Sequence, residues 1–171
     1  MIRYKPLKET IEQTKTPEFK KWFGKSKVVD KSGNPLVVYH GGGKNFTNFK
    51  SATERPFGIE GIYFAENPNL SSMYAMQHQK KQQSYPVYLK ITNPGDIKEM
   101  RDWGYDNNAS PKEVTKYFQK LGYDGAYDKE AHYKGGSDKV WIVFKPNQIK
   151  SAIGNNGNFD YRSNNILEGI E

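Results

Sequence analysis

The sequence predicts a single mixed α+β domain in which short strands are interspersed with two or three helices. A chain of 171 residues fits one domain and is long enough to bury a core without disulfides or metals. Short apolar runs bounded by Gly, Pro and Asn indicate strands, and proline-led segments with apolar residues at helical spacing indicate helices. Because both kinds of run alternate irregularly and no repeat divides them, the α+β class is favoured.

The composition narrows the class of protein. Aromatic residues make up 14% of the chain and all apolar residues only 35%, so the core must depend on aromatic side chains. The mean hydropathy of −0.90 predicts no membrane span, and the polar N-terminus shows no secretory signal. We therefore expect a cytoplasmic site of action. Without cysteine, and with three dispersed histidines, no metal site is expected.

The net charge of +7 favours an acidic partner, such as nucleic acid, a phosphate-bearing ligand or an acidic protein face. The lysines are spread along the chain, which is more typical of a solvated surface than of a dedicated nucleic-acid face. We therefore expect a protein partner ahead of nucleic acid.

The N-terminal part predicts an arm, a helix and a hairpin. Residues 1–16 are polar and irregular, as in a loosely docked arm. Thr16 and Pro17 supply the N-cap and first position of a helix that Gly24 ends. Its core face carries Phe19, Trp22 and Phe23. The strand, turn and strand that follow are expected at 27–30, 31–35 and 36–40.

The middle of the chain predicts two strands around a helix. A loop over 41–58 precedes a strand over 61–65. After a turn at 67–69, Asn69 is expected to cap a helix over 70–80. Alternation predicts a strand over 85–91, which Asn93, Pro94 and Gly95 should end as a turn.

The last third predicts one helix and three strands. Ser110 and Pro111 open a helix that extends to about residue 121. A turn and short strand over 122–127, a polar loop over 129–139, a central strand over 140–144 and an edge strand over 148–152 should follow. Gln148 is expected to brace the turn at 122–125 by hydrogen bonds.

Two short motifs indicate a ligand site. Tyr39, His40 and three glycines follow an apolar run, which puts an imidazole at a strand end beside backbone that a flat ligand can approach closely. A lone histidine there is more often structural. The second motif is the run over 61–65, which contains Tyr63 and is followed eleven residues later by Tyr74. On these residues alone, two core tyrosines are the favoured interpretation, so the two motifs must be weighed together.

The order of these motifs resembles the ADP-ribosyltransferases of the diphtheria-toxin and PARP type. The matching pieces are Val38 to Gly42, Gly61 to Phe64, Tyr74 and Trp141 to Phe144. The chain looks closest to the small members found in phage and plasmid polyvalent proteins. The likeness covers roughly residues 18–160, which leaves 1–17 as an arm and 161–171 as a tail. It implies an ADP-ribosyltransferase-like fold with short-stranded mixed sheets and two or three flanking helices.

The resemblance implies roles for the first motif in binding NAD. His40 would hydrogen-bond a ribose hydroxyl. The backbone at Gly41 and Gly42 would pair with the nicotinamide carboxamide, which needs both a donor and an acceptor.

The resemblance also implies that two tyrosines hold the nicotinamide ring. Tyr63 and Tyr74 would sandwich it, because a cationic pyridinium between aromatic faces gains roughly 1–2 kcal/mol per face. Ser71 or Ser72, one turn before Tyr74, would hydrogen-bond the carboxamide.

The chain departs from the family at its third signature position, where Val140 replaces a glutamate. That carboxylate would bind the 2′-hydroxyl of the nicotinamide ribose and stabilise an oxocarbenium-like state. Asp138 could supply the anion, provided that strand pairing extends that far. Alternatively, an anionic group of the substrate assists and one ADP-ribose is transferred, or the chemistry has been lost. Asp128 and Glu130, expected in a loop, are weaker candidates.

The leading hypothesis is a mono-ADP-ribosyltransferase with Asp138, His40 and Tyr63 as catalytic residues. It would be a mobile-element effector that uses NAD and modifies a macromolecule in the cytoplasm of a host or competitor. An inert interaction module of the same fold is the main alternative, favoured by Val140. A toxin that only hydrolyses NAD is a third possibility.

Overall fold

The structure is a computed structural model that describes residues 13–42, 58–69, 83–133, 136–155, 157 and 159–167. Within these residues it contains three α-helices, one short 3-10 helix and seven strands. In chain order they are α2 (Pro17–Phe23), β1 (Val38–Gly42), β2 (Ile62–Ala65), β3 (Gln83–Leu89), β4 (Pro94–Asp96), α4 (Ile97–Asp106), α5 (Pro111–Lys120), β5 (Gly125–Tyr133), β6 (Gly136–Val143), η1 (Pro146–Gln148) and β7 (Ile149–Ser151). The expected mixture of short strands and a few helices is confirmed.

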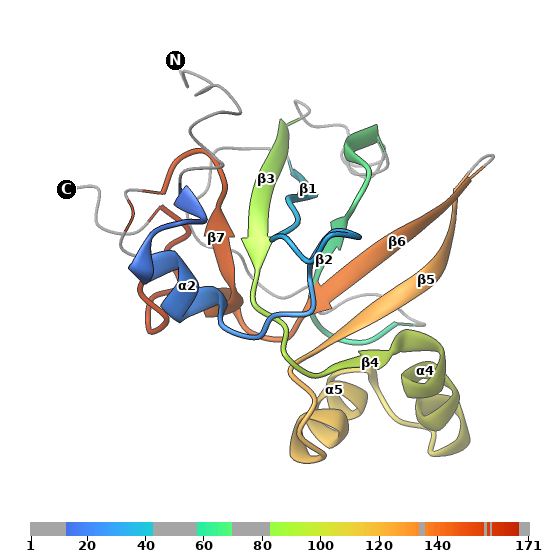
Figure 1. The fold of residues 1–171 in the computed structure, drawn as a ribbon. Coiled ribbons are helices and arrows are strands. Elements are labelled where there is room, and N and C mark those ends of the chain that lie inside the picture. The colour runs from blue at the N-terminus through green and yellow to red at the C-terminus, as the bar shows by residue number, and fades with distance from the viewer. Residues whose placement is uncertain are drawn as a thin grey trace.

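All seven strands belong to one mixed sheet in the order β4-β5-β6-β2-β1-β3-β7. Strands β4 and β5 are parallel, and every other neighbouring pair is antiparallel. Figure 1 shows α4 and α5 together beneath β4, and α2 beside β7 at the other end of the sheet. Strand β6 lies inside the sheet and β7 at its edge, as the sequence predicts.

Strand β6 carries apolar side chains on both faces because both faces are covered. Trp141 and Val143 belong to a core cluster with residues of β1, β2, β3 and β7. Val140 and Ile142 belong to a second cluster with residues of α4 and α5. The continuous apolar run that the sequence presents is therefore the signature of a strand buried on two sides.

Helix α2 begins and ends as predicted. The Thr16 hydroxyl accepts a hydrogen bond from the backbone N–H of Phe19, and Gly24 ends the helix with φ of 53°. The aromatic face of the helix is buried against Tyr88 and Phe159. The cap therefore fixes where the helix begins, and burial of the aromatic face fixes how it packs on the domain.

The prediction of a polar loop over residues 129–139 is wrong. Strands β5 and β6 pair as a hairpin, with Ala131 opposite Asp138 and Tyr133 opposite Gly136. Figure 1 shows this hairpin extending away from the rest of the domain. Backbone hydrogen bonds can hold such an arm without an apolar face, so its sequence carries no strand pattern.

Other elements also differ from the prediction, and strands β1 and β3 are each shifted by two residues from the predicted 36–40 and 85–91. The segment 27–30 forms a single bridge between Val29 and Pro35 instead of a strand. The expected turn at Pro94 and Gly95 is strand β4, which leads directly into α4. Helix α4 was not predicted, although Asp96 caps it by accepting from the backbone N–H of Lys98 and an Asp-x-x-Glu pattern was available as a signal.

The helix after β2 begins earlier than predicted. The side chain of Asn67, not Asn69, accepts a hydrogen bond from the backbone N–H of Asn69 at 2.9 Å. Residues 68 and 69 already have helical conformation. Pro68 thus follows the cap, the same order as at Thr16-Pro17 and Ser110-Pro111. The rest of the expected helix over 70–80 lies outside the described residues.

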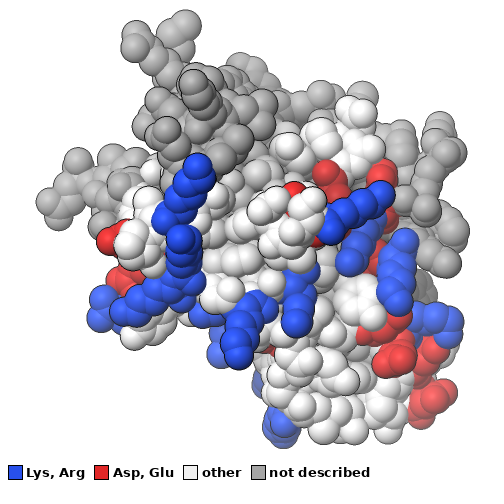
Figure 2. Space-filling model, in the orientation of Figure 1, with Lys and Arg blue, Asp and Glu red and all other residues white. Residues whose placement is uncertain are grey.

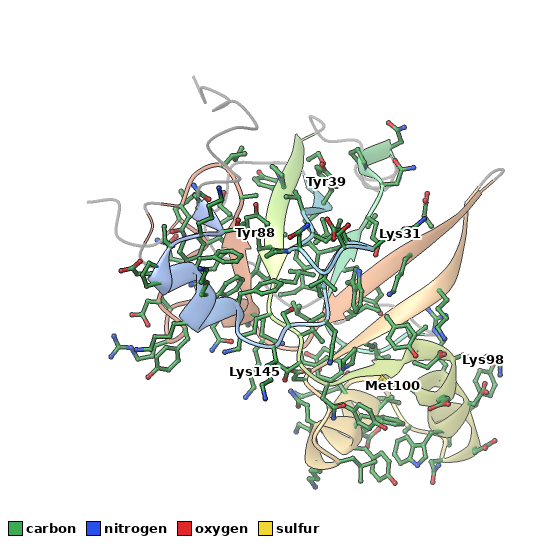
Figure 3. All side chains as sticks on the ribbon, in the orientation of Figure 1. Lys31, Tyr39, Tyr88, Lys98, Met100 and Lys145 are labelled. Carbon is green, nitrogen blue, oxygen red and sulfur yellow. The ribbon has the colours of Figure 1, made fainter. Side chains whose placement is uncertain are left out.

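Tyr88 on β3 makes stability sensitive to alkaline pH. Burial, with Tyr39 of β1 as a smaller cause, raises the pKa of Tyr88 from 10.0 to about 12 (Figure 3). Folding therefore favours the neutral phenol, and this contribution, fully present below pH 10, is lost as the pH rises towards 12. We expect it to amount to about 2 kcal/mol.

The measurement is urea unfolding at a series of pH values for the wild type and for Tyr88→Phe. The wild type should lose stability more steeply than the variant above pH 10, where the unfolded chain ionises first. Parallel curves for the two proteins would contradict the assignment to Tyr88.

Candidate functional site

His40 is held at the junction of β1 and β2. Its Nδ1 lies 2.8 Å from the backbone carbonyl oxygen of Tyr63, and its ring is 5.4 Å from the ring of Phe64. A carbonyl can only accept, so Nδ1 carries the proton and donates it. In the neutral ring Nε2 is then an acceptor, which suits a hydroxyl donor. The half-buried imidazole is thus fixed in both orientation and tautomer.

The glycines after His40 lie where β1 and β2 part. Strand β1 pairs with β3 through all five of its residues, from Val38 to Gly42. In the described part of the chain, its register with β2 is a single pair, Tyr39 with Ala65. Gly41 and Gly42 therefore belong to the end of β1 that leaves β2. Backbone without a Cβ at such a divergence permits close approach by a flat ligand.

Tyr63 has its side chain on the face of the sheet covered by α4 and α5. It pairs with Ile142 of β6, and its hydroxyl donates to the carbonyl oxygen of Ile59 at 2.8 Å. The alternation of strand side chains puts His40 with Phe64 on the opposite face. The structure thus brings His40 to the backbone of Tyr63 and not to its ring.

The remaining residues predicted to bind nicotinamide are outside the described part of the structure. They are Ser71, Ser72 and Tyr74. The sandwich of the ring between Tyr63 and Tyr74 therefore stays a prediction.

Val140 occupies an apolar position on the same face as Tyr63. It is 6% exposed and pairs with Ala65 on one side and Asp128 on the other. Pairing of β6 continues to Gly136, so the condition set for Asp138 is met. Asp138 is half-buried and lies two residues before Val140 in β6, so its side chain is on the same face of the strand.

Asp128 also lies beside the position of the missing glutamate. It is part of β5 and not of a loop, and it stands directly across from Val140. Paired residues on antiparallel strands have Cβ atoms roughly 4.5–5.5 Å apart. The guanidinium of Arg101 on α4 lies 3.9 Å from its carboxylate. Glu130 is likewise in β5, but its side chain is not described.

Residues 30–159 match the protein-family model described as ADP-ribosyltransferase in polyvalent proteins. The chain belongs to this family. The matched range contains His40, Tyr63 and Val140, and the sheet with its few helices is consistent with the ADP-ribosyltransferase fold. No curated protein matches the chain.

Sequence reasoning missed one carboxylate of this ADP-ribosyltransferase domain. Glu66, which directly follows the run over 61–65, accepts a hydrogen bond from the indole N–H of Trp141 at 2.9 Å. Its backbone N–H donates to the backbone carbonyl oxygen of Lys139, so Glu66 continues the pairing of β2 with β6. Alternation along the strand then puts its side chain on the same face as His40. The position just after the second motif was the only signal available.

Lys139 interacts electrostatically with Glu66 and also contacts Trp141. Its ammonium lies 4.0 Å above the ring of Trp141. Burial lowers the pKa of Lys139, Glu66 opposes that shift, and Lys129 adds to it. The ADP-ribosyltransferase domain therefore carries a polar Glu66–Trp141–Lys139 group at the end of β2.

Two further features of the described residues concern partners. They contain no group of three or more His, Cys, Asp or Glu arranged to hold a metal ion. Among the helices that can be described, none has the length and apolarity needed to cross a membrane.

Proposed function

We propose that this domain is a mono-ADP-ribosyltransferase that cleaves NAD, releases nicotinamide and transfers one ADP-ribose to a macromolecule. The observation that carries the proposal is the fixed imidazole of His40 beside the diverging β1 glycines, in a chain of the ADP-ribosyltransferase family. As an effector of a mobile element, it would act in the cytoplasm of a host or competitor.

The proposed reaction breaks the bond between C1′ of the ribose and the nicotinamide nitrogen. The bonding electrons leave with nicotinamide, and a nucleophile of the acceptor bonds to C1′ and loses its proton. His40 Nε2 accepts a hydrogen bond from a ribose hydroxyl, while the backbone of Gly41 and Gly42 holds the carboxamide. Such fixed contacts orient the reacting centre and reduce the entropy cost of reaching the transition state.

Stacking and hydrogen bonding hold the leaving group in the same proposal. Tyr63 and Tyr74 clamp the pyridinium ring, and Ser71 binds its carboxamide. Tyr63 and His40 have their side chains on opposite faces of the sheet, so this role requires the nicotinamide ring to lie where β1 and β2 part.

Positive charge that develops on the ribose requires an anion. Val140 supplies none, and we assign the role to Asp138, with Asp128 as the second candidate. Two carboxylates on the same face border the position that the family glutamate would occupy. A site that lacks the glutamate itself fits the transfer of a single ADP-ribose without chain growth.

An inert binding module is the second candidate function. Its support is the burial of Val140 in the apolar cluster beneath α4 and α5, where a carboxylate would be costly. In that case the domain would retain the fold and block a partner.

Incubation with adenine-labelled NAD and a cell lysate tests the proposal. We expect free nicotinamide and a labelled macromolecule. Nicotinamide without a labelled acceptor would instead identify an NAD hydrolase. If neither nicotinamide nor label appears, and NAD does not quench tyrosine or tryptophan fluorescence, the inert module is supported.

The two candidate carboxylates are separable by mutation. We expect Asp138→Asn to lower the rate of nicotinamide release about tenfold, because a carboxylate near the ribose stabilises its developing charge. Asp102→Asn is the matched control, since this exposed carboxylate lies on α4 and pairs with Lys98. An effect of Asp128→Asn alone would transfer the role to Asp128. Unchanged rates in both variants would contradict both assignments.

A further inference from the structure

An open groove lies in a part of the domain that does not include His40 or Tyr63. It is a groove of about 760 Å³ between α2, α5 and the segment over 144–148. Trp22 of α2 and Lys120 of α5 both line it. Neither His40 nor Tyr63 is among the residues of its wall. We call it the basic groove.

The charge of the basic groove is strongly positive. Its wall includes four lysines, Lys90, Lys116, Lys120 and Lys145. None of these lysines forms an ion pair within the described residues. Figure 2 shows Lys and Arg side chains gathered on this face of the molecule, and Figure 3 places Lys145 between α2 and α5.

One acidic residue, Asp124, also lies in the wall, so the groove has four positive charges against one negative charge. Both carboxylate oxygens of Asp124 accept hydrogen bonds from Thr92 and Asn93, each at 2.8 Å. The carboxylate therefore serves the turn that precedes β4. An anionic ligand in the basic groove meets ammonium groups from three separate segments of the chain.

Aromatic rings accompany the lysines. Tyr161 is 56% exposed, and its backbone carbonyl accepts a hydrogen bond from the side chain of Asn147 at 3.0 Å. Tyr123 is half-buried, with its ring packed edge-on against Phe118 at 5.7 Å. The exposed ring of Tyr161 is thus available for stacking with a planar base, whereas the ring of Tyr123 packs against the core beneath α4 and α5.

The floor of the basic groove is fixed before any ligand arrives. The buried side chain of Gln148 donates to the carbonyl oxygens of Lys90 and Asp124, at 2.8 and 2.7 Å. These bonds join two segments of the wall that are distant along the chain. A preformed groove loses little conformational entropy on binding.

We propose that the basic groove binds single-stranded nucleic acid, with its lysines at the phosphates and Tyr161 against a base. Lysine acts as a point charge for phosphate, and aromatic faces stack on bases of any sequence. An acidic protein segment would use the same lysines, and stacking of a planar base on the ring is the contact that distinguishes a nucleic-acid strand from it. The groove therefore favours nucleic acid over the protein partner expected from sequence.

Binding can be measured without NAD, so its failure is distinct from failure of the proposed transferase activity. The probe is a fluorescein-labelled, mixed-sequence DNA strand of about twelve nucleotides, followed by anisotropy. With four lysines at phosphates, log K should fall with log salt with a slope of about −3. Lys120→Gln with Lys145→Gln should halve that slope and weaken binding about tenfold.

A charge-matched control is available on other parts of the surface. Lys31→Gln with Lys98→Gln removes two exposed lysines that lie away from Lys145 (Figure 3). We expect this control to bind like the wild type within about twofold. Equal weakening in the control and groove variants would overturn the proposal, as would no binding by the wild type at low salt.

The ring of Tyr161 separates nucleic acid from a general anion site. Tyr161→Ala should weaken binding of the strand about fivefold, and Tyr161→Phe should retain it, because stacking needs the ring and not the hydroxyl. Since Tyr161 is exposed, its removal should leave the melting temperature unchanged. Poly-glutamate binding as tightly as the DNA strand, with no effect of Tyr161→Ala, would show an acidic-protein site and overturn the proposal.

Discussion

Replacement of His40 by alanine should reduce nicotinamide release by about 100-fold. Two losses combine in this variant. The ribose hydroxyl loses its acceptor, and β1 loses the side-chain bond to the backbone of Tyr63. Misplacement of a reacting group by about 1 Å can by itself cost about 100-fold in rate. The measurement is steady-state release of nicotinamide at saturating NAD.

His40→Asn separates the two losses. The amide nitrogen of asparagine can take the place of Nδ1 and still donate to the Tyr63 carbonyl, but asparagine has nothing in the position of Nε2. We expect this variant to unfold at a urea concentration near that of the wild type and to be as impaired as His40→Ala. Wild-type activity in His40→Asn would show that the imidazole is structural and does not bind the ribose.

Replacement of Gln148 by leucine should cost about 3 kcal/mol of folding free energy. The side-chain oxygen of Gln148 accepts from the backbone N–H groups of Phe144 and Lys145, and its nitrogen donates to Lys90 and Asp124. Leucine fills the space but leaves these four backbone groups without their partner, and an unsatisfied buried group costs about 1–3 kcal/mol. The expected fall in Tm is about 6–12 °C, since about 1 kcal/mol shifts the Tm of a domain of this size by about 2–4 °C.

Gln148→Glu is the closest control, because it exchanges only the donor nitrogen for an oxygen. At neutral pH that oxygen would face the carbonyls of Lys90 and Asp124, so this variant should also be destabilised. The difference in Tm between this variant and the wild type should shrink as the pH falls, because the new carboxyl gains a proton to donate. A Tm within about 2 °C of wild type in both variants would disprove the bracing role predicted from the sequence.

Local chemistry explains which elements the sequence could predict. The starts of α2 and α5 are visible because Thr16-Pro17 and Ser110-Pro111 satisfy helix ends with side chains and a fixed backbone angle. The central strand is visible because both of its faces are apolar. In each case the pattern that predicts the element lies within the element's own residues.

Two strand regions were missed because backbone pairing, and not a side-chain pattern, stabilises them. The outer part of the hairpin between β5 and β6 depends on backbone bonds, which leave no side-chain pattern. Strand β4 pairs in parallel with β5, a partner 31 residues along the chain at Pro94 and Gly125. Single-sequence patterns report local preference and cannot report such pairing.

The sequence alone determined that His40, Tyr63 and Val140 follow the order of an ADP-ribosyltransferase, because identity and spacing are properties of the chain. Only the tertiary structure decided that His40 contacts the backbone of Tyr63 and that Asp128 stands across from Val140. It also assembled the basic groove from lysines that the sequence scatters. Register between strands and the meeting of separate segments follow from burial of the shared core, and that is a property of the whole fold.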